Sequence, residues 1–360
     1  MSSTKQQIQG ENKKVRESNI EFLRIVAMLL IVGCHFATHG GFSFDSSSVT
    51  VPRIWWHILE LGGNFGTDLF VMISGYFLIK DVSIPPKMNK IILFWLQIIF
   101  YSVILFFLAF PLGYGDSSLK NILMSVLPIS YSAWWFASAY FVLYLLHPYI
   151  NLALNAMDKK QYGIFLLVLI IIWSIIPLLT TSDFQSNNLI ELFLMYAIAG
   201  YIRKFGLFEK ASAITWAGLW IVFTILAFLS SLILLIIGTK ISVASSHSTY
   251  FYTRTCILTI ARAVTFFMLF LKIDIGRNNI INKISSAMFG VYLLHDSKLL
   301  RKFLWLDFFD VSSYKDTLKI IPYSIFVVGI VFVSCILIEF LRQLCIETPI
   351  KKLFYRKSSG

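Results

Sequence analysis

Charged residues are scarce in this sequence: Lys, Arg, Asp and Glu together make up 14% of its 360 residues. Soluble domains carry about 25%. The chain is instead 57% hydrophobic, with a mean hydropathy of +0.75, and it contains repeated apolar runs of about 20 residues, the length of a membrane-spanning helix. A soluble fold of this composition would expose large apolar patches. The sequence therefore excludes an ordinary soluble domain and predicts an all-α, multi-pass membrane protein.

Cysteines are few, and the familiar motifs of soluble enzymes are missing. Cys34, Cys256, Cys335 and Cys345 all fall within or at the ends of apolar runs, which favours packed thiols over a disulfide framework or a zinc site. The sequence has no Walker A loop, no dinucleotide-binding glycine pattern, no HExxH and no nucleophile elbow. No cleavable signal is evident before the first apolar run, so we expect that run to be an uncleaved anchor.

Ten apolar segments are candidate transmembrane helices. We expect them to form one membrane domain over residues 19–345, between a cytoplasmic N-terminal tail (1–18) and a cytoplasmic C-terminal tail (346–360). An amphipathic stretch at 119–131 is expected to lie in the membrane interface. The predicted spans are residues 19–38, 63–80, 91–111, 134–154, 162–180, 189–203, 214–237, 254–272, 284–303 and 320–345.

The distribution of basic residues predicts the orientation of this domain. With both ends of the chain inside, 19 of the 31 Lys and Arg residues fall in cytoplasmic segments and only five in outer segments. This asymmetry predicts an N-in, C-in topology and explains the net charge of +12 without a nucleic-acid partner. The outer end of the ninth span is an exception to this positive-inside rule, because it carries three basic residues: Lys298, Arg301 and Lys302.

The first span, NIEFLRIVAMLLIVGCHF, carries Arg24 and His35 eleven residues apart. This spacing is about three helical turns, so both side chains share one face, separated by a rise of about 16 Å. Ionisable groups inside a membrane usually mark a site. One interpretation is that Arg24 binds an anionic cytosolic cosubstrate, Glu21 orients Arg24, and His35 is a general base or nucleophile. The alternative is a local Glu21–Arg24 ion pair and a histidine that only packs.

Further polar groups fall on or near the predicted spans. His39 follows His35 by one helical turn, a spacing that also suits a metal pair, but no third ligand is obvious nearby and we predict no metal. Lys87 and Lys90 are expected to meet cosubstrate phosphates, although both also fit ordinary membrane anchoring. We expect six side chains to contact the substrate, each of which has a purely structural alternative: His39, Asp68, Ser74, Trp135, Tyr140 and His295, the last with Asp296 beside it.

With these residues in place, the chain resembles the acyltransferase-3 family of integral membrane acyltransferases, in particular the branch that acetylates or succinylates bacterial surface polysaccharides. The most specific element is an Arg-x10-His signature, matched by Arg24 and His35. Supporting similarities follow in order along nearly the whole chain: FVMISGYFL, WWFASAYFVLYLLHPYI, FGVYLLHD and IETPIKKLF.

The resemblance implies transfer of an acyl group, usually acetyl, from acyl-coenzyme A to a sugar hydroxyl of an envelope glycan or exopolysaccharide. Acyl-coenzyme A is then a cosubstrate rather than a permanently bound cofactor. The implied partners are membrane lipids, a glycan or lipid-linked oligosaccharide acceptor, and proteins of polysaccharide synthesis or export. The implied location is the bacterial plasma membrane.

In this family pattern His35 matches the essential histidine and Arg24 the essential basic residue. The chain departs from the family pattern at Lys87-Met88-Asn89-Lys90, where many members carry Arg-x-x-Arg. Lysine keeps the charge but cannot bind a phosphate in a bidentate geometry as arginine does. Glu21 stands where aspartate is common. A different class of function, a transporter or flippase of a lipid-linked glycan, would place Arg24 and His35 along a translocation path. Transporters tend to show internal repeats, and none is evident here.

Overall fold

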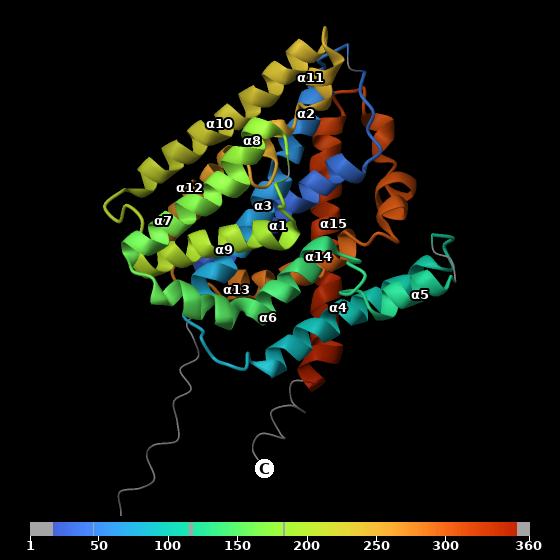
Figure 1. Ribbon diagram of the computed structural model, residues 1–360. Helices are drawn as coiled ribbons and strands as arrows, with labels where there is room; N and C mark the ends of the chain where they lie inside the picture. The colour runs from blue at the N-terminus through green and yellow to red at the C-terminus, as the bar shows by residue number, and fades with distance from the viewer. Residues whose placement is uncertain (1–16, 46, 115–117, 183, 351–360) are drawn as a thin grey trace, which may run out of the picture.

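The computed structural model describes residues 17–45, 47–114, 118–182 and 184–350. These residues form a helical bundle without a β-strand, which confirms the predicted all-α class (Figure 1). Most of the two predicted tails, residues 1–16 and 351–360, lies outside the described residues.

The centre of the bundle is built from α1 (Ser18–His39), α3 (Gly62–Leu78) and α9 (Asn188–Phe205), with α3 packed against both of the others. Glycines allow this close packing. A Cβ at Gly66 would lie 2.7 Å from the Ala27 carbonyl oxygen of α1, and one at Gly75 would lie 2.6 Å from the Tyr196 carbonyl oxygen of α9. Small residues at such crossings are typical of helices packed within a membrane.

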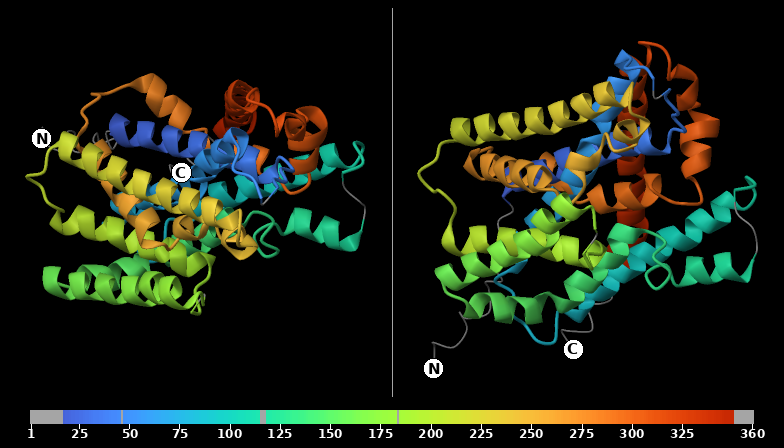
Figure 2. Two further views of the ribbon diagram at one scale, coloured as in Figure 1. Left: turned by 90° about the horizontal axis from the view of Figure 1, so that it is seen from above. Right: turned by 45° about the horizontal axis from the view of Figure 1, so that its top comes forward.

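Longer helices surround this centre, and shorter ones connect them. Figure 1 shows α10 at one edge of the bundle, and α4 and α5 extend away from it on another side in both views of Figure 2. The long elements are α4 (Met88–Ala109), α6 (Trp135–Ala156), α7 (Lys159–Ile170) continued by η1 (Ile171–Ile175) and α8 (Ile176–Thr180), α10 (Ala213–Gly238), α12 (Ile257–Lys272) and α15 (Ile320–Arg342). The short ones are α2 (Val51–Glu60), α5 (Leu119–Val126), α11 (Ser242–Ser246), η2 (Tyr250–Tyr252), α13 (Asn279–Ser285), α14 (Met288–His295), η3 (Phe303–Phe308), η4 (Val311–Tyr314) and η5 (Gln343–Glu347).

Seven helical segments among the described residues are long and apolar enough to cross a membrane. They correspond to the first, third, fourth, fifth, seventh, eighth and tenth predicted spans. The second and sixth predicted spans form the helices α3 and α9, of 17 and 18 residues, which are not among the seven. The count of ten therefore remains a prediction.

Residues 284–303, the ninth predicted span, do not form one continuous helix, so the prediction of a single helix here was wrong. It contains the short helix α14 and then a break at Asp296, where the backbone leaves the helical conformation. The segment nevertheless runs the length of α1: Ser285 hydrogen-bonds Glu21 near the start of α1, and Trp305 packs edge-on against Phe36 near its end. Apolar periodicity cannot report such a break, and broken helices are common where a membrane protein forms a site.

Candidate active site

The break after α14 places two polar residues beside the histidines of α1. His35 Nδ1 lies 2.9 Å from His295 Nε2. Asp296 Oδ1 lies 3.5 Å from His35 Nδ1 and 3.4 Å from His39 Nε2. The predicted shared face of His35 and His39 is thus completed by residues about 260 positions away in the chain.

The hydrogen bonds of this cluster define which nitrogen of His35 is free. His295 Nδ1 lies 2.6 Å from the Val291 carbonyl oxygen, which only accepts, so this nitrogen carries the proton. In neutral His295, Nε2 is then an acceptor, and the proton between the two rings belongs to His35 Nδ1. His35 Nε2 is left with a lone pair, which is the atom that a general base or a nucleophile uses.

Asp296 is fully buried, and Arg301 stabilises its charge. The guanidinium donates to Oδ1 from Nε at 3.0 Å and from Nη2 at 2.6 Å. A buried carboxylate without a partner would cost several kcal/mol. The ion pair explains why a basic residue occurs at this end of the ninth predicted span, where the positive-inside rule predicts few. Arg301 was not among the predicted site residues, although its position five residues after Asp296 was visible in the sequence.

The same cluster has a geometry that a metal ion can use. One ligand atom each from His35, His39 and Asp296 lies within 4.8 Å of the others. Asp296 is therefore the third ligand that was not evident near the two histidines. However, Arg301 already neutralises Asp296, and His35 Nδ1 is engaged with His295. The arrangement favours proton transfer, and the absence of a metal remains a prediction.

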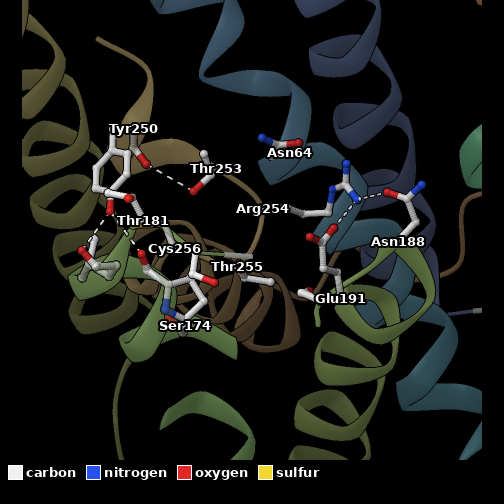
Figure 3. A pocket seen from close by; sticks show the side chains of 14 residues that line it. Asn64, Ser174, Thr181, Asn188, Glu191, Tyr250, Thr253, Arg254, Thr255 and Cys256 are labelled. Carbon is white, nitrogen blue, oxygen red and sulfur yellow. Dashed lines mark hydrogen bonds and ion pairs between the residues drawn. The ribbon is translucent and has the colours of Figure 1, made fainter. Parts of the chain in front are cut away.

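The cluster forms one wall of a cavity of about 360 Å³, here called the His35 cavity. His39 and Trp135, both predicted to contact the substrate, line it together with Arg254 and Arg301. The Arg254 guanidinium lies 4.0 Å above the Trp135 ring and forms an ion pair with Glu191 of α9 (Figure 3). Arg254 thus covers one face of the Trp135 ring at the wall of the cavity.

Arg24 lies in a separate cavity of about 330 Å³, here called the Arg24 cavity. Its guanidinium forms the predicted ion pair with Glu21 and also donates to Ser285 Oγ at 3.2 Å. Lys90 lines the same cavity. Lys87 is not among the lining residues and pairs with Asp81 at 2.8 Å in an exposed loop. Of the two predicted phosphate-binding lysines, the structure thus brings only Lys90 to Arg24.

Ser74 and Tyr140 also line the Arg24 cavity, where the Tyr140 hydroxyl donates to Ser74 Oγ at 2.8 Å. We predicted them as substrate contacts, and they lie with Arg24 rather than with His35. Asp68 is fully buried on α3, lines neither cavity, and has no hydrogen-bond partner on either carboxylate oxygen among the described residues. Its predicted role in substrate binding therefore remains a prediction.

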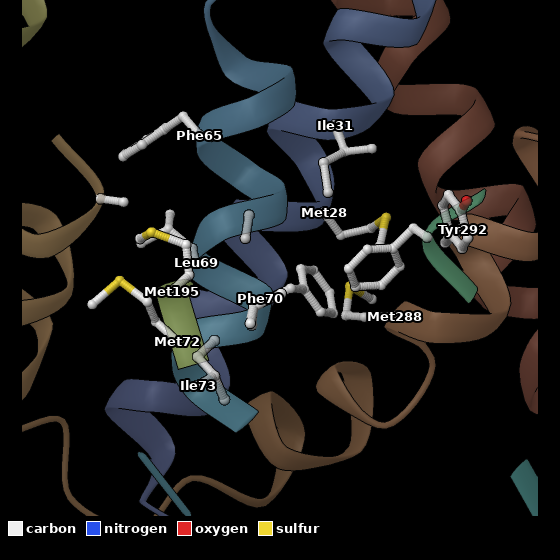
Figure 4. Packing of buried hydrophobic residues seen from close by; sticks show 14 of the residues in the cluster. Met28, Ile31, Phe65, Leu69, Phe70, Met72, Ile73, Met195, Met288 and Tyr292 are labelled. Carbon is white, nitrogen blue, oxygen red and sulfur yellow. The ribbon is translucent and has the colours of Figure 1, made fainter. Parts of the chain in front are cut away.

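An apolar layer lies between the two cavities. Ile31 lines the His35 cavity and Phe70 lines the Arg24 cavity, and Figure 4 shows the buried Met28 of α1 between these two side chains. Figure 4 shows Met28 facing Tyr292 and Met288 of α14. A molecule that reaches from Arg24 to His35 must displace part of this layer.

Comparison with known proteins assigns the chain to a family. A family model described as an acyltransferase domain matches residues 17–339. Comparisons with curated proteins and with solved structures gave no match. The family match covers most of the chain, including α1 with Arg24 and His35 and the segment that carries His295, Asp296 and Arg301. The chain therefore belongs to the acyltransferase-3 family and is a multi-pass membrane acyltransferase.

Proposed function

We propose that the protein is an O-acyltransferase of the bacterial plasma membrane, with both ends of its chain in the cytoplasm. It moves an acyl group, most simply acetyl, from acyl-coenzyme A to a sugar hydroxyl of an envelope glycan or exopolysaccharide. The observation that carries the proposal is the hydrogen bond of His35 to His295, beside Asp296, at the wall of the His35 cavity.

His35 acts as a general base in this proposal. Its Nε2 takes the proton of the acceptor hydroxyl while the hydroxyl oxygen attacks the thioester carbonyl carbon. Asp296 stabilises the imidazolium that forms, from 3.5 Å. The C–S bond then breaks, His35 returns the proton to the thiolate, and coenzyme A leaves as the thiol. The same lone pair would also serve if His35 carried the acyl group transiently.

Arg24 and Lys90 bind the phosphates of the acyl donor, which enters the Arg24 cavity from the cytoplasm. The helical rise from Arg24 to His35, about 16 Å, is spanned by the extended pantetheine arm. The arm passes the layer at Met28 and Tyr292. The acceptor enters the His35 cavity from the other side, where His39 and Trp135 contact it.

His35→Ala tests this proposal. The purified variant in lipid nanodiscs is supplied with labelled acetyl-coenzyme A and envelope glycan, and acylated glycan is measured by mass spectrometry. We expect a loss of about 10²- to 10⁴-fold, because the base is removed. His247→Ala is the matched control, since His247 is exposed and lines neither cavity. Full acylation by the His35 variant would refute the role of His35, and movement of glycan without modification would favour a transporter.

A further inference from the structure

A polar cavity of about 340 Å³, distinct from the Arg24 cavity and here called the second cavity, adjoins the His35 cavity. It lies between the end of the α7–α8 helix, the start of α9 and residues 250–256 (Figure 3). Asn64, Thr253 and Arg254 line both cavities. A ligand in the second cavity is therefore the immediate neighbour of a group held beside His35.

Ser174 gives the second cavity a hydroxyl without a partner. This residue is only 1% exposed, it lines the cavity, and its Oγ has no hydrogen bond among the described residues. A buried hydroxyl without a partner is costly. Ser174 lies in the π-helical turn Ile171–Ile175, and such turns frequently occur at functional sites. Both observations indicate a ligand that supplies the missing hydrogen bond.

The charges of the second cavity cancel. Arg254 forms an ion pair with Glu191, donates to Asn188 Oδ1 at 2.9 Å, and stacks on Trp135. The remaining polar lining consists of hydroxyl and amide groups, including those of Ser174 and Thr255. Such groups both donate and accept hydrogen bonds, as sugar hydroxyls do. An anionic ligand would find only a guanidinium that Glu191 already neutralises.

We propose that this cavity binds a neutral, hydroxyl-rich sugar ring, the unit of the acceptor glycan next to the one that is acylated. The proposal rests on the proposed function for the identity of the neighbouring unit. The enzyme then selects its acceptor by at least two sugar units, and it discriminates against acceptors with a uronic acid at the second position.

Thiol protection tests binding without catalysis. In a chain with the four native cysteines replaced by alanine, Thr255→Cys places a thiol in the second cavity. Ser246→Cys is the control, because Ser246 is exposed at the same end of the bundle and outside the cavity. The rate of labelling by methyl methanethiosulfonate is measured with and without methyl glycosides of glucose, galactose, N-acetylglucosamine and glucuronic acid.

We expect at least one neutral glycoside to slow labelling at position 255 by threefold or more, with no change at position 246 and no protection by the glucuronide. Ser174→Ala should reduce this protection. His35→Ala should leave it intact, so a failure of the proposed chemistry is distinguishable from a failure of the second cavity. No protection by any neutral glycoside, equal protection by the glucuronide, or equal slowing at position 246 would overturn the proposal.

A kinetic measurement in the chain with its native cysteines covers the case in which the cysteine-substituted chain does not fold. Ser174→Leu fills the cavity without touching the His35 cluster. We expect it to raise KM for disaccharide acceptors by tenfold or more and to leave KM for a single methyl glycoside within about twofold. An equal effect on both acceptors would contradict binding of a second sugar unit.

Discussion

Replacement of Asp296 by Asn isolates the electrostatic contribution to the proposed reaction. Asparagine keeps the shape of the side chain but removes the charge that lies 3.5 Å from His35 Nδ1. At an effective dielectric constant of about 20, a unit charge at that distance stabilises the imidazolium by roughly 4–5 kcal/mol. Arg301 binds the same oxygen and offsets part of this energy. We therefore expect kcat to fall by about 10²- to 10³-fold, with a smaller change in KM for acyl-coenzyme A.

The assay is steady-state acyl transfer by purified protein in nanodiscs, with both substrates varied. Asp316→Asn is the control for loss of an exposed carboxylate at the same end of the bundle. Because Asp296→Asn leaves the Arg301 guanidinium without its carboxylate, the double variant Asp296→Asn/Arg301→Gln separates folding from catalysis. It should recover thermal stability but not kcat. A folded Asp296→Asn variant with kcat within threefold of the unmodified protein would refute the reasoning.

Two further predictions concern stability. Gly290→Ala should lower the free energy of unfolding by about 1–3 kcal/mol, because its Cβ would lie 2.6 Å from Glu339 Cγ, and Arg342 and Tyr101 hold Glu339 in place. The comparison is thermal unfolding of Gly329→Ala, whose Cβ meets nothing within 4 Å. Equal unfolding midpoints for the two variants would contradict the packing argument. For Asp81, burial raises the pKa, but hydrogen bonds from Lys87 and Ser83 outweigh it and hold the pKa below its ordinary value. The ion pair of Asp81 with Lys87 therefore stabilises the fold above the carboxyl's unfolded pKa of about 4, and this stabilisation is lost as the pH falls below that value. The difference in unfolding midpoint between the unmodified protein and Asp81→Asn should shrink between pH 6 and pH 3. A difference independent of pH would contradict the assigned pKa direction.

Predictions from local spacing agree best with the structure. The eleven-residue spacing from Arg24 to His35 predicts one helix face, and α1 is a continuous helix over both residues. The i,i+3 pairing of Glu21 with Arg24 likewise depends only on helical geometry. Each of these features is set by residues close together in the chain.

Features that depend on distant residues were predicted less well. The partners of His35 are 260 residues away, and the helix break at Asp296 interrupts an apolar run that reads as continuous. Glu191 and Arg254 lie 63 residues apart in the chain, yet they pair with each other, and Arg254 lines both the His35 cavity and the polar cavity beside it. Ser74 and Tyr140 share a cavity with Arg24 because α3 and α6 place them there.

The sequence by itself determined the membrane class, the helical architecture and the axis from Arg24 to His35, because composition and helical periodicity are local properties. The tertiary structure alone decided which nitrogen of His35 is free, which carboxylate supports it, and which residues line the cavities on either side of the apolar layer. The physical reason is that an imidazole that takes up a proton inside a membrane needs a buried counter-charge. Here that charge comes from Asp296, which reaches His35 only because α14 ends beside α1.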